Sequence, residues 1–237
     1  MKLILAVLAA TLSLGAVPAQ AEEAASPLSF NVSLTSDYRY RGISQARLKP
    51  ALQGGADYDF GNGFYLGTWG STIKWIKDGG GDSDIEVDFY GGYKTEVAKG
   101  LTLDVGLLQY VYPSNKLNPS ANTLEVYGAL SFGPLTAKYS HSTTNLFGAP
   151  DSKGSGYLDV SATFELGEGF NLVPHVGHQK VKHNSAASYT DYSLAVTKDW
   201  GGFSFSAAYV DTDIVVIGGK GKDLGKSGLV VSVKKAF

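Results

Sequence analysis

Three charged residues near the start of this chain occupy alternate positions. They are Asp37, Arg39 and Arg41, which would share one face of an extended segment. One carboxylate and two guanidinium groups on a common face can set the field that a passing charged solute meets, as rings of charged side chains do in channels. The same charges could instead neutralise one another and fill the space that they face.

Later segments repeat this alternation and enlarge the set of polar candidates. Each candidate lies on the polar face of a segment whose other face is apolar. The predicted pore-lining residues are Asp37, Arg39, Arg41, Asp57, Asp59, Glu86, Asp88, Lys94, Asp104, Glu125 and Lys138. Acidic residues outnumber basic ones here, which favours cations, although a register shift of one residue would exchange the two faces.

The spacing of nucleophiles and bases argues against an enzyme. His141 lies between Ser140 and Ser142, and outer-membrane phospholipases use a serine with a histidine. Adjacent residues of a strand point to opposite faces, so neither serine can serve this histidine. Since no nucleophile elbow, dinucleotide-binding glycine motif or phosphate loop stands out, we predict no catalytic residue, and a lipid-modifying enzyme is only the third alternative.

Two groups of possible metal ligands also indicate no site. His175 and His178 are three residues apart, which places them on opposite faces of a strand. The acidic segment 78–84 lacks the ligand spacing and terminal glutamate of an EF-hand loop, so we interpret it as a solvated, glycine-rich loop. The chain has no cysteine, hence no thiolate ligand, and we predict neither a metal nor a cofactor.

The elements that position these residues are predicted to be strands, because apolar and polar residues alternate. In the segment 101–107, for example, leucine and valine occupy the odd positions. About twelve strands are predicted, at residues 28–42, 50–60, 64–75, 84–95, 101–112, 122–132, 135–146, 157–166, 170–181, 189–198, 203–212 and 227–237. An even number is typical of bacterial outer-membrane barrels. The predicted fold is therefore all-β, a transmembrane antiparallel up-and-down β-barrel.

The segments between the predicted strands alternate in length. Short connections such as 61–63 and 133–134 follow longer ones such as 43–49 and 113–121. Short periplasmic turns and longer external loops are the topology of an outer-membrane barrel.

Aromatic residues gather near both ends of the predicted strands, as in the girdles of membrane barrels. The predicted girdle comprises Phe60, Phe64, Phe132, Phe164, Phe170, Trp200, Phe203 and Phe237 beside the short turns, and Tyr38, Tyr40, Trp75, Tyr110 and Tyr112 near the long loops. The alternative is that these rings pack the core of a soluble barrel.

Both ends of the sequence agree with export. Lys2, the apolar run 3–17 and the segment 18–21 (Pro-Ala-Gln-Ala) are typical of a signal peptide that is cleaved after Ala21. We predict a signal peptide at 1–21 and a barrel domain at 22–237. The last strand ends on Phe237, which resembles the ending that the barrel-assembly machinery reads in outer-membrane proteins.

Four segments resemble the TorF family, a porin-like outer-membrane β-barrel family of unknown function. They are residues 31–45, 50–58, 88–93 and 100–106. The resemblance extends over essentially the whole chain after the predicted signal peptide. It implies a β-barrel in the outer membrane of a Gram-negative bacterium, without a known substrate or catalytic residues.

The expected function is that of a porin, which lets small hydrophilic solutes diffuse passively through a charged lumen. The alternative is a non-conducting barrel with a structural or surface-interaction role. Outer-membrane lipids and lipopolysaccharide are expected neighbours, and Lys220, Lys222 and Lys226 could meet lipid phosphates, although ordinary solubility explains them as well. With a formal net charge of −2 and no basic block, no nucleic-acid partner is expected.

Overall fold

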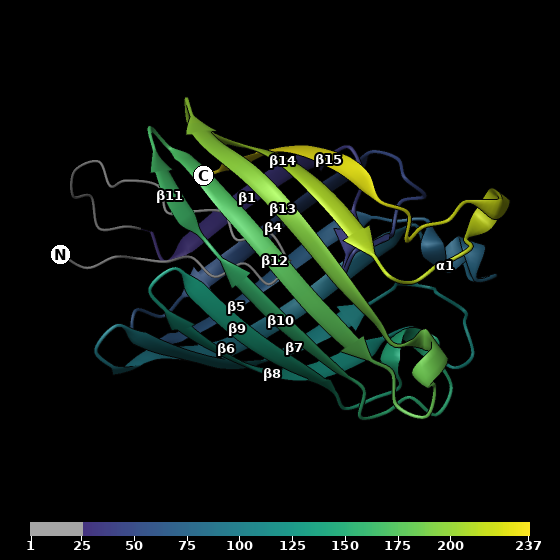
Figure 1. The fold of residues 1–237 in the computed structure, drawn as a ribbon. Helices are drawn as coiled ribbons and strands as arrows, with labels where there is room; N and C mark the ends of the chain where they lie inside the picture. Colours follow the sequence, from purple (N-terminus) through teal and green to yellow (C-terminus); the bar gives the residue numbers. More distant parts are fainter. Residues whose placement is uncertain (1–25) are drawn as a thin grey trace.

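Antiparallel strands form a closed barrel in the computed structural model, which describes residues 26–237 (Figure 1). The barrel strands are β1 (Leu28–Thr35), β4 (Ala51–Asp59), β5 (Phe64–Thr72), β6 (Ile85–Ala98), β7 (Leu101–Val111), β8 (Thr123–Phe132), β9 (Leu135–Ser142), β10 (Gly156–Ala162), β11 (Phe164–Gly167), β12 (Phe170–Lys180), β13 (Tyr189–Trp200), β14 (Phe203–Thr212) and β15 (Gly228–Ala236). Because β10 and β11 continue one another on either side of Thr163, the barrel has twelve strands, and the predicted fold class is confirmed.

Every barrel strand pairs with its sequence neighbours, and the circle closes between the first and last strands. β1 pairs with β15 over five residues, from Asn31 opposite Ala236 to Thr35 opposite Ser232. The backbone amide and carbonyl of Phe237 also bond to those of Phe30. Closure leaves no open edge, which is the condition for a sheet to exist in hydrocarbon.

Connections differ in length at the two ends of the barrel. One end carries short turns, among them 99–100, 133–134 and 201–202, and the other carries six longer loops, among them 36–50 and 213–227. Small elements lie in these loops: β2 (Arg39–Tyr40), β3 (Ile43–Ser44), α1 (Trp75–Asp78), η1 (Leu146–Gly148), η2 (Ser185–Ala187) and η3 (Gly219–Gly221). The last residue lies at the turn end, opposite α1 (Figure 1). The predicted signal peptide at 1–21 lies outside the described residues.

The first predicted strand is too long by seven residues. The span 28–42 ends instead at Thr35, because the side chain of Thr35 hydrogen-bonds to the backbone of Asp37 and turns the chain out of the sheet. Residues 39–44 then form the β2–β3 hairpin. Arg41 and Gly42 stand at its turn with φ of 47° and 78°, the left-handed region that tight hairpin turns require.

Two other predicted spans are too long at the loop end, where the chain leaves the sheet for α1 and η1. The remaining predicted spans agree with the structure to within about three residues. No helix within residues 26–237 has the length and apolar character that crossing a membrane would need.

The two faces of the barrel wall differ in chemistry. Large apolar side chains are exposed on the outside, for example Phe89 at 54 %, Leu107 at 53 % and Leu194 at 50 %. Inward positions on the same strands carry polar, charged or small residues, such as Asp88, Asp104 and Ser193. An apolar exterior around a polar interior is the inverse of a soluble protein and suits a bilayer.

The predicted girdle residues fall into an exposed group beside the short turns and a buried group near the long loops. Eight of the predicted girdle residues are exposed beside the short turns: Phe60, Phe64, Phe132, Phe164, Phe170, Trp200, Phe203 and Phe237. Tyr38, Tyr110 and Tyr112 are buried, and Tyr40 and Trp75 pack against them. Their assignment to an outer girdle is therefore wrong. The hydroxyl groups of Tyr38, Tyr40 and Tyr110 are hydrogen-bonded inside the loop end of the barrel, whereas the buried indole nitrogen of Trp75 has no hydrogen-bond partner within residues 26–237.

A charge on the apolar exterior should destabilise the barrel according to its depth. We expect Leu194→Arg, at the middle of β13, to lower the free energy of unfolding in phospholipid vesicles by about 2–4 kcal/mol, because arginine is desolvated there. Thr190→Arg, on the same face near the loop end, should cost less than about 1 kcal/mol. Equal costs at the two positions would contradict a membrane-spanning exterior.

Candidate functional site

The inward face of the barrel holds most of the predicted pore-lining residues. Seven lie on inward strand positions: Asp57, Glu86, Asp88, Lys94, Asp104, Glu125 and Lys138. Asp59 shares this parity but is exposed at the turn end, where its carboxylate accepts a hydrogen bond from the amide of Gly61. The other three, Asp37, Arg39 and Arg41, lie on the chain around the β2–β3 hairpin rather than on a wall strand.

Arg41 reaches from the hairpin to two strands on one side of the barrel, β8 and β12, which β9 and β10 separate. Its guanidinium donates two hydrogen bonds to Glu125 on β8, at 2.8 and 2.9 Å, and a third to Gln179 on β12. The guanidinium also lies over the rings of Tyr40 and Tyr157, at 4.8 and 4.2 Å from their centroids. With only 4 % of Arg41 and 1 % of Glu125 exposed, this ion pair is buried within the loop end of the barrel.

A second set of contacts holds the base of the hairpin. Asp37 is buried and accepts hydrogen bonds from Arg39 and from the hydroxyl of Ser44. Burial raises the pKa of Asp37, although Ser44 and Arg39 oppose that shift. Arg39 also donates to the backbone carbonyls of Gly42 and Lys226, each at 2.9 Å. The hairpin is thus tied to the long β14–β15 loop.

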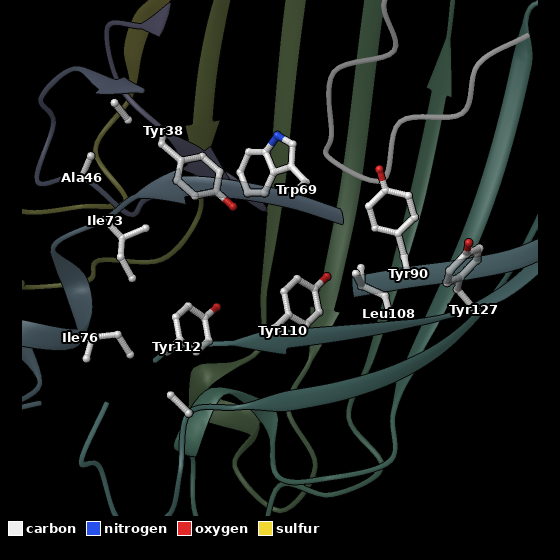
Figure 2. Close-up of a cluster of buried hydrophobic side chains, with 12 residues drawn as sticks. Tyr38, Ala46, Trp69, Ile73, Ile76, Tyr90, Leu108, Tyr110, Tyr112 and Tyr127 are labelled. Atoms are coloured by element: carbon white, nitrogen blue, oxygen red, sulfur yellow. The ribbon is translucent and has the colours of Figure 1, made fainter. Parts of the chain in front are cut away.

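Aromatic side chains surround the hairpin in what we call the mouth cluster: Tyr38, Tyr40, Trp69, Trp75, Tyr110, Tyr112 and Phe147. Figure 2 shows Tyr38 and Trp69 facing Tyr110 and Tyr112 within the barrel. Tyr38 donates a hydrogen bond of 2.9 Å to the buried carboxylate of Glu86. Tyr40 and Tyr110 share a hydrogen bond of 2.7 Å. The hydroxyl groups give the buried polar network donors that an aliphatic core would lack.

The turn half of the lumen is more open. Asp57, Lys94, Lys138 and Lys234 point inward yet are half-exposed, so solvent reaches the interior wall from this end. Some of the acids there bind tyrosines, as where Tyr65 donates to Asp104 at 2.6 Å. The inward side chains therefore change along the barrel from charged and partly exposed at the turn end to largely aromatic and buried at the loop end.

Tyrosines reach this interior by lying against glycines of the neighbouring strand. A Cβ atom on Gly106 would stand 2.5 Å from the hydroxyl oxygen of Tyr127, and one on Gly177 would stand 1.9 Å from that of Tyr157. Real Cβ atoms do not approach that closely, so both positions require glycine. The rings lie along the wall instead of projecting across the lumen.

Sequence reasoning did not single out a histidine-centred group on β10, β12 and β13. His175 contacts Asp159 at 3.0 Å, and its other ring nitrogen lies 3.8 Å from Asp191. The hydroxyl of Tyr157 donates to Asp191 at 3.0 Å. The two-residue alternation of these strands predicts that Tyr157, Asp159, His175 and Asp191 all face inward, but it does not predict that they are close together. His178 points outward, as the spacing predicted.

The structure shows the surroundings of His141 and of the acidic loop 78–84, for which the sequence predicted no catalytic or metal site. His141 faces outward while Ser140 and Ser142 are buried inside, which separates this histidine from both hydroxyls. In the acidic loop, Asp84 binds Lys74 and Lys77, and Asp82 binds Lys116. Hydrogen bonds from Lys74 and Lys77 lower the pKa of Asp84 to about 2. Within residues 26–237, no group of three or more histidine, aspartate and glutamate side chains has a metal-binding arrangement, and this includes His175 with Asp159 and Asp191.

Comparisons with known proteins agree with this architecture. A family described as "Bacterial protein of unknown function (Gcw_chp)" matches residues 20–237, and no curated protein matches the chain. The solved "KdgM porin in complex with disordered oligogalacturonate" is similar with a TM-score of 0.55 at 8 % identity, over 89 % of this chain and 98 % of its own. The NanC porin gives 0.55 at 11 % identity, over 88 % and 98 %. At such low identity the likeness shows the fold alone.

The Arg41–Glu125 pair should be strongly coupled. We expect Arg41→Met to destabilise the folded chain by about 3–5 kcal/mol, because it leaves the Glu125 carboxylate buried without its counter-charge. Glu125→Gln combined with Arg41→Met should recover most of that loss. Chemical unfolding of the two single variants and the double variant measures the coupling, and additive effects would contradict it.

Proposed function

The chain belongs to the Gcw_chp family, and from that membership and the geometry of the lumen we propose that it is a porin-like outer-membrane channel for small hydrophilic solutes. One observation carries the proposal: a closed barrel with an apolar exterior encloses inward charges that solvent reaches. Twelve strands enclose more space than the roughly eight whose interior is filled by their own side chains. The predicted leader at 1–21 and the porin folds of KdgM and NanC support the same placement.

The proposed mechanism is diffusion through two regions in series. A solute that enters at the turn end meets the half-exposed charges, including Asp57, Lys94 and Lys138. It then meets the hairpin and the mouth cluster, where Arg41 and Glu125 occupy the lumen. Passage therefore depends on small displacements of the hairpin, and the channel conducts weakly compared with an unobstructed barrel of this size.

Inward charge favours cations. Acidic residues at inward positions include Asp57, Glu86, Asp88, Asp104, Glu125, Asp159 and Asp191, against Lys94, Lys138 and Lys234 on the wall and Arg41 on the hairpin. In the part of the chain that the structure describes, Asp88 Oδ1 is buried and accepts no hydrogen bond. A buried carboxylate oxygen without a donor attracts a cation or a proton. Oligogalacturonate, the anionic sugar bound to KdgM, therefore does not suit this lumen.

A non-conducting barrel is the second candidate, and the hairpin is the observation that favours it. Three hydrogen bonds and two aromatic contacts hold Arg41 in place, and rigid contacts of this number would seal the mouth. The barrel would then act as a scaffold for its long loops.

Ion conduction separates the two candidates. We expect the refolded chain in a planar bilayer to give discrete current steps, with a reversal potential in a potassium chloride gradient whose sign indicates cation preference, because acids dominate the lumen. Silence from protein that is shown to be folded would contradict the channel. Steady current with anion preference would retain the channel and reject the proposed role of the acidic lumen.

Weakening the hairpin contacts should enlarge the current. We expect the double variant Arg41→Gln and Glu125→Gln to give larger single-channel steps than the unmodified chain, because neutral amides hold the hairpin across the lumen less tightly. Lys116→Gln with Asp82→Asn, which removes an exposed loop ion pair, is the matched control and should leave the steps unchanged. Unchanged steps in both variants would show that the hairpin does not limit conduction.

A further inference from the structure

Basic side chains gather on one sector of the outer surface at the loop end. Three of the chain's four histidines lie there with three lysines. We call this set the basic rim: His141, Lys153, His178, Lys180, Lys182 and His183. Its members belong to β9, β12, the β9–β10 loop and the β12–β13 loop.

Strand register brings these residues into neighbouring rows. His141 and Lys180 are both paired with Gly156, so they flank it on the outer face. One row further from the loops, Tyr139 and His178 flank Leu158 in the same way. His141 and Lys180 are therefore separated by two strand spacings, roughly 10 Å, and the hydroxyl of Tyr139 lies over Gly156 between them.

Gly154 marks where the side chains converge. A Cβ atom at this position would stand 3.2 Å from Cδ of Lys182, 3.4 Å from its Nζ and 3.8 Å from Cε1 of His141. The ammonium of Lys182 and the imidazole of His141 therefore both lie beside Gly154. Gly156, in contrast, is covered by the ring of Tyr139, whose hydroxyl oxygen would stand 2.2 Å from a Cβ atom there.

Most charges of the rim make no ion pair, unlike those of the loops that contain Lys74, Lys77 and Lys116. Lys74 and Lys77 bind Asp84, and Lys116 binds Asp82. Within residues 26–237, by contrast, Lys153, Lys180 and Lys182 make no ion pair, and of the rim only His183 does, with Asp151 at 3.0 Å. The outward face of β14 instead carries Asp211, which accepts a hydrogen bond from Tyr192. The rim is therefore one group of positive charge at the loop end, and Lys220, Lys222 and Lys226 of the β14–β15 loop are another.

An apolar surface continues directly below the rim. Tyr139 is 51 % exposed, and Leu158 and Val176 are each 46 % exposed on the same three strands. A ligand that fits both parts carries an anionic group above a hydrocarbon chain. Lysine and imidazolium groups donate charge-assisted hydrogen bonds to phosphate oxygens, and cationic groups near an anionic membrane surface strengthen lipid binding.

We propose that the basic rim is a binding site for the phosphate of a phosphorylated lipid, whose acyl chains lie along Tyr139, Leu158 and Val176. This inference rests on the proposed placement of the barrel in the outer membrane, with its long loops at the outer surface. Lys180, Lys182 and His141 contact the phosphate, and Lys153 and His178 border it. The site lies on the outside of the wall and is separate from the lumen.

Binding of purified lipid A to the refolded chain in detergent tests the site, with native mass spectrometry as the readout. We expect lipid A with two phosphates to bind, and the variant Lys180→Gln with Lys182→Gln to weaken that binding roughly tenfold or more, because each lysine near an anionic headgroup strengthens binding severalfold. Lys220→Gln with Lys222→Gln removes the same charge from the β14–β15 loop and should change binding less than about twofold. Both variants must migrate as folded barrels.

Three results would overturn the proposal. These are equal binding of phosphorylated and dephosphorylated lipid A, equal losses in the two double variants, and binding of inorganic phosphate as tight as that of the lipid, which would identify a site for the free anion. A barrel that is silent in the bilayer yet binds phosphorylated lipid would reject the channel and retain this site. A conducting barrel that binds phosphorylated and dephosphorylated lipid A equally would retain the channel and reject this site.

Discussion

Backbone hydrogen bonding between the first and last strands is the interaction on which this structure depends. A peptide group inside hydrocarbon has no water to bond with, so each strand must find a partner on both sides. β1 and β15 supply the final pairing. Once the circle closes, the apolar outer faces meet lipid, and the polar side chains are confined to an interior whose contents the barrel must then stabilise.

Hydrogen bonds organise that interior together with the packing of the mouth cluster. Buried carboxylates such as Glu86 and Glu125 find donors in tyrosine hydroxyls and in Arg41. A soluble core of this polarity would lose stability to desolvation. In this barrel many large apolar side chains face outward instead, so the buried polar groups are stabilised by bonding to one another. The β2–β3 hairpin contributes the guanidinium that links β8 to β12 inside the barrel.

Much of the barrel could be predicted from sequence because the signal has a period of two. Alternation along segments such as 101–107 determines both the strand and its faces, and glycine-containing turns mark its ends. The hairpin could not be predicted, since residues 36–44 continue the same alternation while Thr35 and Asp37 turn the chain inward through contacts that only the folded barrel provides. The basic rim depends on register across three strands, which no local pattern contains.

Tyr110 and Tyr112 were predicted to lie in an outer girdle but are buried inside the barrel. Tyr110 and Tyr112 have the same parity as Asp104, so the alternation that located the pore-lining acids also placed these rings inside. Proximity to the strand ends suggested a girdle instead. Parity is the stronger criterion within a strand, because adjacent side chains must point to opposite faces whatever their chemistry.

The glycines opposite the inward tyrosines have a consequence for the bore of the barrel. An aromatic ring that rests on a bare backbone occupies the thickness of the wall, in the manner by which aromatic residues cover glycines in other sheets. Gly106 receives Tyr127 and Gly177 receives Tyr157. A ring that lies against a glycine in this way does not project into the lumen, so the lumen keeps the volume that the ring would otherwise occupy. The effective diameter is thus set by where glycine stands on the wall as well as by the number of strands.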